Sequence, residues 1–205
     1  MALIFCVGRN DEARAVAMDT AVDREAPFWF TRSPHAVIER GGAIAYPPGT
    51  AEHHRAVVLG QGGFRVRVER ARDLVLGHAA GLDMTRRNLQ PPAGAEGWPW
   101  DTGKDVEPSA VIGTIMPAAR IGHPTAGRIA LAVDGELRQE AELSDLVGTG
   151  PELIPALSTL DRLQPGDAIM TGTPAGVGAG RAGQRLEGEI AGVGRVRLSM
   201  RPRES

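Results

Sequence analysis

The sequence predicts an α+β fold that is rich in β-strand, and two observations carry this prediction. Glycine (27) and proline (15) together make up about a fifth of the 205 residues while aromatic residues make up 4%, which indicates many tight turns. Short apolar runs, several alternating with polar residues, are typical of strands. A chain of this length suits one domain with a substantial core, so we expect residues 1–205 to form a single domain.

The charge balance and the first residues narrow the class of partner. The 23 basic and 25 acidic residues give a net charge of -2, which offers no electrostatic reason for binding nucleic acid or an anionic membrane. The apolar start, residues 1–9, is too short to cross a bilayer, so it predicts a first strand. Cys6 is the sole cysteine and cannot form an intramolecular disulfide. We expect a cytoplasmic protein that binds small molecules.

The first half of the chain is predicted to contain short strands between turns. We expect strands at residues 1–9, 56–59 and 64–68, and a very short strand flanked by two turn signals within residues 41–50. A loop or edge strand is expected at 26–37, and short helices at 10–18 and 69–77.

The second half holds the clearest pattern. Residues 128–139 alternate about the two-residue turn Asp134-Gly135 and predict a hairpin in which Leu137 resumes the apolar face. Residues 186–200 predict a second hairpin. A helix over 151–161 would place Ile154, Leu157 and Leu160 on one face, with Pro155 keeping it short, and residues 164–178 form a turn, a strand and a glycine-rich loop. The Pro- and Gly-rich residues 91–104 predict an irregular loop.

Residues 82–90 (LDMTRRNLQ) concentrate an acid, two guanidinium groups and two amides in nine residues. The pattern indicates a strand that ends in a turn or short helix, with Asp83 or Thr85 able to cap it. Side chains at such an edge are open to ligands and metals. Residues 178–183 spell GxGxxG, but strand-like residues follow, so a dinucleotide site is not expected.

Five separated motifs, taken in order, resemble the fumarylacetoacetate hydrolase family and most closely its short bacterial members that act on acylpyruvates. They are VGRN at 7–10, YPP at 46–48, GLDMTRRNLQ at 81–90, PWDTGK at 99–104 and TGTPAGVG at 171–178. The resemblance covers nearly the whole chain. It implies a β-rich mixed-sheet fold, a homodimer and cleavage of a C–C bond in a 2,4-diketo acid such as fumarylpyruvate, as in the catabolism of aromatic compounds.

The resemblance also implies roles for individual residues. Asp83 corresponds to a ligand of a divalent metal, Mg²⁺ or Mn²⁺. Lys104 is expected to neutralise developing negative charge, and Arg87 and Gln90 to contact the substrate during catalysis. Substrate binding is expected to involve Thr173, which would bind the carboxylate, together with Gly172 and Arg86.

The strand that carries the family's Glu-x-Glu metal ligands departs from the pattern. Without a gap before Gly60, these positions hold Glu52 and His54, which as i and i+2 share one face of a strand. The mixed set Glu52, His54 and Asp83 suits Mg²⁺ less well than three carboxylates do. In a rival register, His53 and His54 match a histidine pair before the acids, and the acids are lost around Arg55 and Val57.

The second departure lies in residues 10–35, which correspond to a short lid. Hydrolytic members carry a tyrosine and then His-x-x-Glu to activate water, whereas this chain has Asp11, Arg14 and Ala17. Arginine stays protonated and cannot act as a base, and losing a positioned base costs about 10²- to 10⁴-fold in rate. His53 or Glu12 could substitute.

Two alternatives therefore stay open beside the hydrolase. One is a metal-dependent oxaloacetate decarboxylase, tautomerase or hydratase, whose chemistry tolerates the missing lid pair better. The other is a catalytically impaired homologue with a structural or regulatory role. Asn88 also replaces the usual acid after Arg87, a smaller change.

Overall fold

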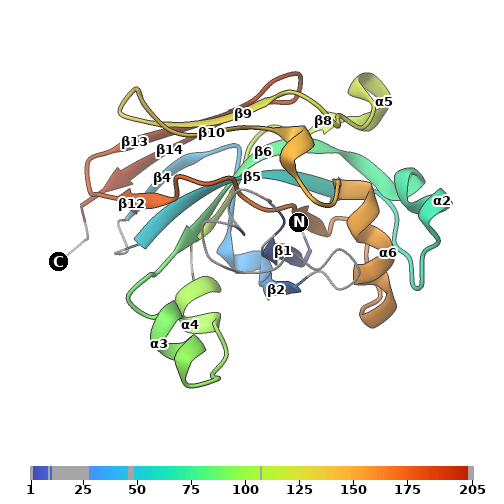
Figure 1. The fold of residues 1–205 in the computed structure, drawn as a ribbon, viewed down its shortest axis with the longest axis horizontal. Coiled ribbons are helices and arrows are strands. Elements are labelled where there is room, and N and C mark those ends of the chain that lie inside the picture. Colours follow the sequence, from blue (N-terminus) through green and yellow to red (C-terminus); the bar gives the residue numbers. More distant parts are fainter. Residues whose placement is uncertain (1, 9, 11–27, 46–48, 107, 203–205) are drawn as a thin grey trace.

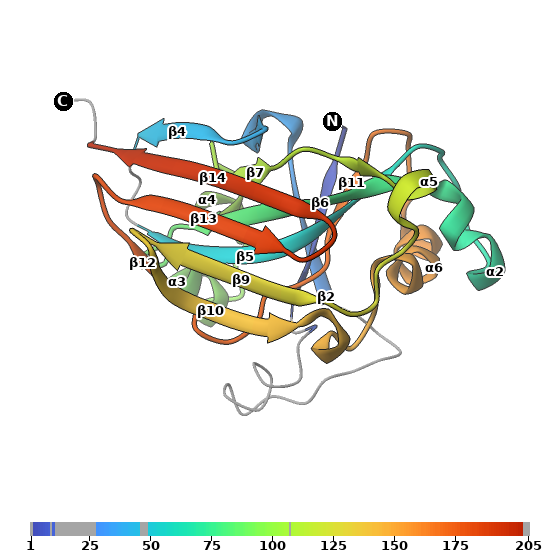
Figure 2. The ribbon, with the colours of Figure 1, turned by 90° about the horizontal axis from the view of Figure 1, so that it is seen from above.

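Two β-sheets stacked on one another form the centre of the described structure (Figure 1). The computed structural model describes residues 2–8, 10, 28–45, 49–106 and 108–202, and for residues 49–54 it describes the backbone alone. Figure 2, which looks down on the second sheet, shows the long strands β5 and β6 passing beneath it.

The larger sheet has the strand order β2-β1-β11-β5-β6-β7-β3, with β12 added on β5 and β8 on β6. Its strands are β1 (Ile4–Gly8), β2 (Phe28–Arg32), β3 (Val37–Glu39), β5 (Gly49–Leu59), β6 (Val75–Thr85), β7 (Ala110–Ile112), β8 (Met116–Pro117), β11 (Ala168–Met170) and β12 (Gly178–Gly180). The antiparallel pair β5 and β6, each of 11 residues, forms its centre.

The smaller sheet has the order β10-β9-β13-β14-β4 and contains both predicted hairpins. Its strands are β4 (Gly42–Ala45), β9 (Arg128–Val133), β10 (Glu136–Glu142), β13 (Arg185–Ile190) and β14 (Gly194–Arg201). Asp134 and Gly135 join β9 to β10 with φ angles of 51° and 86°, as a hairpin turn with two left-handed residues requires.

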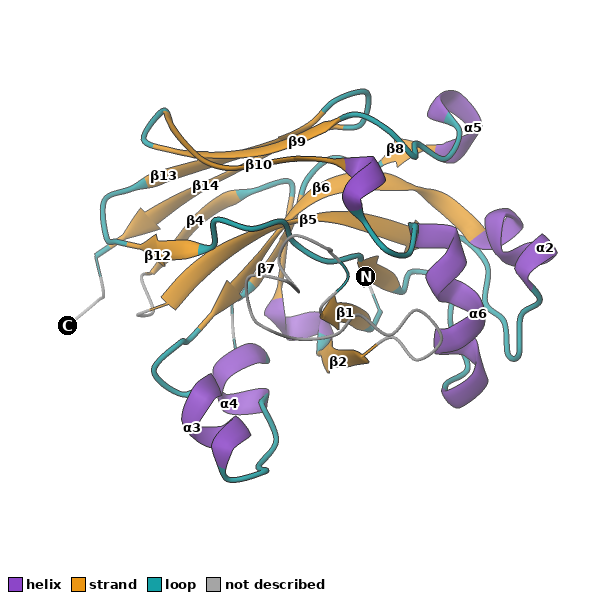
Figure 3. Cartoon of the chain, in the orientation of Figure 1, coloured by secondary structure: helices purple, strands orange, loops and turns teal. Residues whose placement is uncertain are grey.

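Helices are short and lie around the sheets (Figure 3). The α-helices are α2 (Val68–Ala71), α3 (Gln90–Ala95), α4 (Asp101–Lys104), α5 (Ala118–Ile121) and α6 (Gly150–Leu160), and the 3-10 turns are η1 (Pro34–Ala36), η2 (Arg72–Leu74) and η3 (Leu143–Asp145). α6 covers part of the larger sheet through Leu153, Ile154 and Leu157.

The main core lies between the two sheets. Leu82 and Met84 of β6 pack there with Leu131 of β9 and Leu198 of β14. Because neighbouring residues of a strand point to opposite faces, Asp83 lies on the other face of β6, away from this core. One strand thus serves both the core and the polar stretch.

Several predictions are confirmed: the first strand, the two hairpins and the helix over residues 151–161. Residues 26–37 form the edge strand β2 and the turn η1, and the strand expected at 56–59 begins earlier, at residue 49. The helix expected at 69–77 is confirmed in part, because α2 and η2 end at Leu74 and β6 begins at Val75. Residues 11–18 of the expected first helix lie outside the described residues.

Two segment predictions are wrong. Residues 64–67 form no strand, because Arg65 has a φ of 51° and the backbone N–H groups of Arg65 and Val66 bond to Ser158 in α6. The predicted loop 91–104 contains α3 and α4. Pro91 and Pro92 fall in the first turn of α3, where a backbone N–H has no helical partner to lose.

Two apolar side chains and one cap also differ from prediction. Leu137 is 51% exposed because it lies directly opposite Ala132 and shares that residue's face of the sheet, not the face of buried Leu131 and Val133; the bulge that follows brings Gln139, and not Leu137, opposite Leu131. Leu160 is 77% exposed because it ends α6 beyond the core; the helix runs 11 residues, through Pro155. Asp83 caps no helix, since β6 continues to Thr85 and α3 begins at Gln90 without a side-chain cap.

Candidate active site

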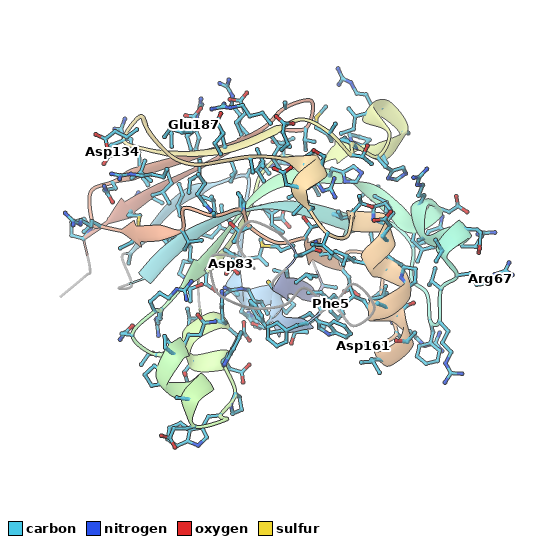
Figure 4. All side chains as sticks on the ribbon, viewed as in Figure 1. Phe5, Arg67, Asp83, Asp134, Asp161 and Glu187 are labelled. Atoms are coloured by element: carbon cyan, nitrogen blue, oxygen red, sulfur yellow. The ribbon has the colours of Figure 1, made fainter. Side chains whose placement is uncertain are left out.

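Asp83 is the centre of the candidate site. It lies in β6, directly opposite Ala110 of β7 and position 52 of β5, and its side chain is 1% exposed. Figure 4 shows Asp83 beneath the central strands, on the side where α3 and α4 lie. A buried carboxylate is costly unless it is paired and hydrogen-bonded.

Two buried cations pair with Asp83. The Arg32 guanidinium donates from Nη2 to Asp83 Oδ1, and Lys104 Nζ donates to Oδ2 over 3.1 Å. Lys104 Nζ also donates to Thr85 Oγ1 at 2.6 Å. The site therefore holds one more positive than negative charge among these three side chains, which favours an anionic ligand.

Arg32 is a site residue that the sequence analysis missed. It ends the edge strand β2, where Phe28, Phe30 and Arg32 alternate and so share a face. Its guanidinium also donates to Ser109 Oγ and to the Met84 carbonyl at 2.9 Å, and the side chain is fully buried. The signal in the sequence was an arginine that continues an alternating aromatic stripe.

Aromatic rings border the two cations. Lys104 Nζ lies 4.8 Å and Arg32 Cζ 5.7 Å from the centroid of Phe30. Trp100, at the start of α4, packs edge-on against Phe28 with centroids 5.2 Å apart. Lys104 is the only lysine among the 23 basic residues, so this site holds the one primary ammonium side chain in the sequence.

The backbone register bears on the two alternatives for the metal-binding strand. Position 52 pairs with Asp83 and position 54 with Gly81, and directly opposite residues of antiparallel strands share a face. Positions 53, 55 and 57 therefore belong to the other face. By backbone register, positions 52, 54 and 83 therefore belong to the same face of the sheet.

Within the residues whose side chains are described, no group of three His, Cys, Asp or Glu side chains could hold a metal ion. The positions of the Glu52 and His54 side chains lie outside that description. The candidate base His53 occupies a position on the face opposite Asp83, and Glu12, Asp11, Arg14 and Ala17 lie outside the described residues.

The remaining polar residues of the stretch 82–90 lie between the end of β6 and the first residue of α3. Arg86 and Arg87 are half-buried, and the Arg86 N–H donates to the Gly103 carbonyl at 2.9 Å, which joins the stretch to α4. Gln90 Oε1 is buried and accepts no hydrogen bond. An acceptor in this state is suited to a donor supplied by a ligand.

The glycine-rich loop after β11 carries Gly172 and Thr173. Thr173 is buried and its Oγ1 accepts a hydrogen bond from Gln139 Nε2 at 3.1 Å, which leaves the hydroxyl proton to donate elsewhere. Gln139, a residue the sequence analysis did not single out, also donates to the Pro174 carbonyl at 2.8 Å. Gly172 has a φ of 117°, a conformation that L side chains rarely adopt.

Asn10 fixes this loop to its neighbour. Its side-chain amide donates to the carbonyls of Thr171 and Gly148, and its Oδ1 accepts from the Gly148 N–H. The VGRN motif thus supports the backbone around Gly172.

No described helix is long and apolar enough to span a membrane.

This geometry can now be compared with known proteins. Residues 3–201 match the family described as fumarylacetoacetate (FAA) hydrolase, C-terminal. The chain belongs to the fumarylacetoacetate hydrolase family. The family, the enzyme class of hydrolases acting on C–C bonds and the β-rich fold predicted from sequence are thereby confirmed.

Individual members of the family are similar over nearly the full chain. A fumarylpyruvate hydrolase from a Ralstonia species is 43% identical over 193 residues, covering 91% of this chain and 100% of that protein. A mitochondrial oxaloacetate tautomerase of Arabidopsis thaliana is 37% identical over 204 residues, covering 98% and 91%. The crystal structure of fumarylpyruvate hydrolase from Pseudomonas aeruginosa, in complex with Mn²⁺ and pyruvate, superposes with a TM-score of 0.92 and 39% identity, covering 98% and 90%.

Proposed function

We propose that this member of the fumarylacetoacetate hydrolase family is a metal-dependent acylpyruvate hydrolase whose substrate is fumarylpyruvate. The observation that carries the proposal is the pairing of buried Asp83 with Lys104, directly opposite position 52 of the neighbouring strand. The 43% identity to a fumarylpyruvate hydrolase over that protein's whole length supports the substrate.

The proposed metal ligands are Asp83, Glu52 and His54, with Mg²⁺ or Mn²⁺ as the ion. The register supports this set over its rival, because positions 55 and 57 fall on the face opposite Asp83. The Mn²⁺ in the structure of the Pseudomonas hydrolase supports a divalent ion. When bound, such an ion would polarise the 2-oxo acid end of the substrate.

The chain's own residues have separate roles in the proposed reaction. Water adds to the distal carbonyl carbon, the C–C bond to the pyruvate portion breaks, and the leaving enolate takes up a proton at carbon. The Lys104 ammonium would stabilise the negative charge that develops on the enolate. Gln90 and Arg87 would orient the diketo acid, and Thr173 would donate to its carboxylate beside Gly172 and Arg86.

Oxaloacetate tautomerase is the second candidate. Arg14 and Ala17 stand where hydrolytic members carry the water-activating pair, and a tautomerase moves a proton without activating water. The similarity to the Arabidopsis oxaloacetate tautomerase, which covers 98% of this chain, supports it. A decarboxylase or hydratase of the same fold belongs to this alternative.

The proposal extends to the organisation of the protein. We infer one catalytic domain over residues 1–205, with residues 10–35 as its lid, acting as a homodimer in the cytoplasm. Analytical ultracentrifugation tests the dimer: sedimentation as a single species of monomer mass at micromolar concentration contradicts it.

Assays of metal-stripped protein test the proposed function. With Mg²⁺ or Mn²⁺ restored, we expect turnover of fumarylpyruvate to exceed turnover of oxaloacetate. The opposite ranking favours the tautomerase, and no turnover of either substrate with either ion favours the catalytically impaired homologue.

Asp83→Asn and a matched control test the metal site itself. The variant is expected to lose bound metal, measured by mass spectrometry, together with its activity. Asp161→Asn changes an exposed aspartate at the end of α6 and is expected to retain both. Unchanged hydrolysis by Asp83→Asn contradicts the metal mechanism.

A further inference from the structure

A second buried polar cluster lies on the face of the larger sheet opposite Asp83. Arg55 of β5 is 1% exposed, and His78 of β6 and Thr171, which directly follows β11, are fully buried. Position 55 pairs with Ala80 and position 78 with Val57, so Arg55 and His78 share this face. The Thr171 N–H donates to the Arg55 carbonyl at 3.0 Å, which places Thr171 beside Arg55 on the next strand.

These three residues carry four buried polar atoms that have no hydrogen-bond partner among the described residues: Arg55 Nε and Nη2, His78 Nδ1 and Thr171 Oγ1. Side-chain contacts of the cluster include a bond from Arg55 Nη1 to the Pro124 carbonyl, at 2.5 Å, a contact of 3.3 Å between His78 Nε2 and His123 Nδ1, and a hydrogen bond between the His78 ring and the backbone of Gly122. Buried polar groups are nearly always paired, so four unpaired atoms from adjacent strands indicate a missing partner.

The free edge of Arg55 defines the chemistry of that partner. Nε and Nη2 form one edge of the guanidinium plane, and their parallel N–H groups match the two oxygens of a carboxylate or phosphate. The Thr171 hydroxyl adds a third donor. In the part of the chain that the structure describes, no carboxylate forms an ion pair with Arg55.

The charges around Arg55 agree with a missing anion. The Arg55 guanidinium is positively charged, as arginine is in proteins, and Glu152 is close enough for its charge to act on it. Burial, then Arg55 and His123, lower the pKa of His78 to about 4. Burial lowers the pKa of His123, as do the charges of Arg72 and Arg55. Glu152 acts on Arg55 without forming an ion pair with it, and the neighbouring histidines supply no negative charge, so the buried guanidinium has no direct counter-ion among the described residues, which is strongly unfavourable.

We propose that Arg55, Thr171 and His78 form a binding site for a small oxyanion, a carboxylate or a phosphate. Half-buried His123 and Pro124, on the segment between α5 and β9, contact His78 and Arg55. Figure 1 shows α5 above the central strands and α3 and α4 below them, so the two sites lie on opposite sides of the sheet. The inference is independent of the proposed function.

The bound oxyanion would join three strands and a connecting segment. Its oxygens would accept from Arg55 on β5 and Thr171 after β11, close to His78 on β6 and to the Pro124 segment that Arg55 already binds. Because a ligand that binds only the folded state stabilises it, the protein should unfold at a higher temperature when the anion is present.

Thermal unfolding of dialysed protein tests the site. Sodium phosphate and sodium acetate are titrated separately at constant ionic strength, which sodium chloride maintains, so that the two arms separate phosphate from carboxylate. The wild type is expected to show a saturable rise in Tm with at least one of them. Chloride lacks the two oxygens that the guanidinium edge binds.

Variants assign the effect to these residues. Arg55→Met is expected to abolish the rise in Tm, and Thr171→Val, which removes one donor, to weaken binding about fivefold. Arg67→Met replaces an exposed arginine, labelled in Figure 4, and should respond as the wild type does. Equal Tm values in phosphate, acetate and chloride, or an undiminished response in Arg55→Met, overturn the proposal.

A crystallographic measurement keeps the test decisive if Arg55→Met does not fold. Wild-type crystals soaked in sodium selenate are expected to show an anomalous peak within hydrogen-bond distance of Arg55 Nε and Nη2. Water alone at this position contradicts an oxyanion site.

Discussion

Lys104 and His78 are both buried, one on each side of β6. Their surroundings differ: those of Lys104 stabilise a positive charge, and those of His78 do not. Lys104 lies between a carboxylate and a hydroxyl, and both accept hydrogen bonds from its ammonium group. His78 lies beside an arginine and a second histidine, which disfavour its protonated form.

Lys104→Met removes the ammonium group and keeps an unbranched side chain. If Lys104 stabilises the enolate as proposed, kcat should fall by about 10²- to 10³-fold while KM changes much less, since the charge develops in the transition state. Steady-state kinetics on fumarylpyruvate measure both constants. Arg70→Met, an exposed change, serves as the control. A rise in KM with an unchanged kcat would assign Lys104 to substrate binding instead.

His78 should make stability depend on pH. Its pKa is about 4 in the folded protein against 6.5 in the unfolded chain, so between these values the unfolded chain binds more protons. The free energy of unfolding should fall as pH drops from about 6.5 to about 4, by at most about 3 kcal/mol from this residue, and no further below that. Denaturant unfolding at pH 7.0, 5.5 and 4.5 measures it.

The matched variant for this pH effect is His78→Gln, which cannot take up the proton. The difference in unfolding free energy between wild type and His78→Gln should narrow or reverse as the pH is lowered. A constant difference across the range means that His78 does not titrate as inferred.

At the scale of elements, the polar stretch depends on contact between α3 and α4. Gly103 lies in α4, and a Cβ added there would lie 3.0 Å from both the Cβ and the N atom of Gln90. The Gly103 carbonyl also accepts the Arg86 N–H. A side chain at this position would therefore shift two proposed substrate contacts at once.

Gly103→Ala should separate positioning from stability. Alanine favours a helix by about 1 kcal/mol over glycine, and this gain opposes the cost of the close contact with Gln90, so Tm should change little. The displacement of Gln90 should lower kcat/KM roughly 3- to 10-fold. Gly178→Ala is the control, since an added Cβ there meets one atom, at 4.0 Å. Equal activity in both variants contradicts the role given to the contact between α3 and α4.

Elements with strong local patterns were predictable from sequence, and those fixed by distant contacts were not. Asp134-Gly135 between alternating strands identified the hairpin, because the turn chemistry is local. The alternation of residues 64–68 predicted a strand that does not form. The reason is a distant contact: α6, about 90 residues later, accepts the hydrogen bonds that hold Arg65 and Val66 in a loop. The prolines of α3 suggested a loop, although the first turn of a helix accepts them.

The candidate site shows the same division. Asp83 and Lys104 lie in two motifs that are recognisable in the sequence, and in the structure Lys104 Nζ lies 3.1 Å from Asp83 Oδ2. Arg32 comes from an edge strand 51 residues before its partner, and its burial depends on sheet order, which no local pattern reveals. Arg55 was likewise not predictable as a site residue, because only the register of β5 and β6 shows that it lies on the face opposite Asp83.

At the scale of the whole molecule, the second sheet supports the strand that carries the site. Leu198 of β14 is 1% exposed in the core between the sheets, where it packs in one cluster with Leu82 and Met84, the neighbours of Asp83 in β6. Among the described residues, the smaller sheet contributes no side chain to the ion pairs around Asp83, although Gln139 of β10 contacts the glycine-rich loop at Thr173. The core residues of β14 should therefore contribute to stability and not to the chemistry at Asp83.

Leu198→Ala tests this division between support and chemistry. The cavity should lower the free energy of unfolding by about 2–5 kcal/mol, which for a chain of this size corresponds to a Tm lower by roughly 5–15 °C. Because the cavity opens on the face of β6 opposite Asp83, kcat/KM at 25 °C should stay within about twofold of the wild type. Leu137→Ala, an exposed leucine of the same sheet, should change stability by less than about 0.5 kcal/mol. A large loss of kcat/KM in folded Leu198→Ala would mean that the two layers are coupled through β6, and that the position of Asp83 depends on the packing behind it.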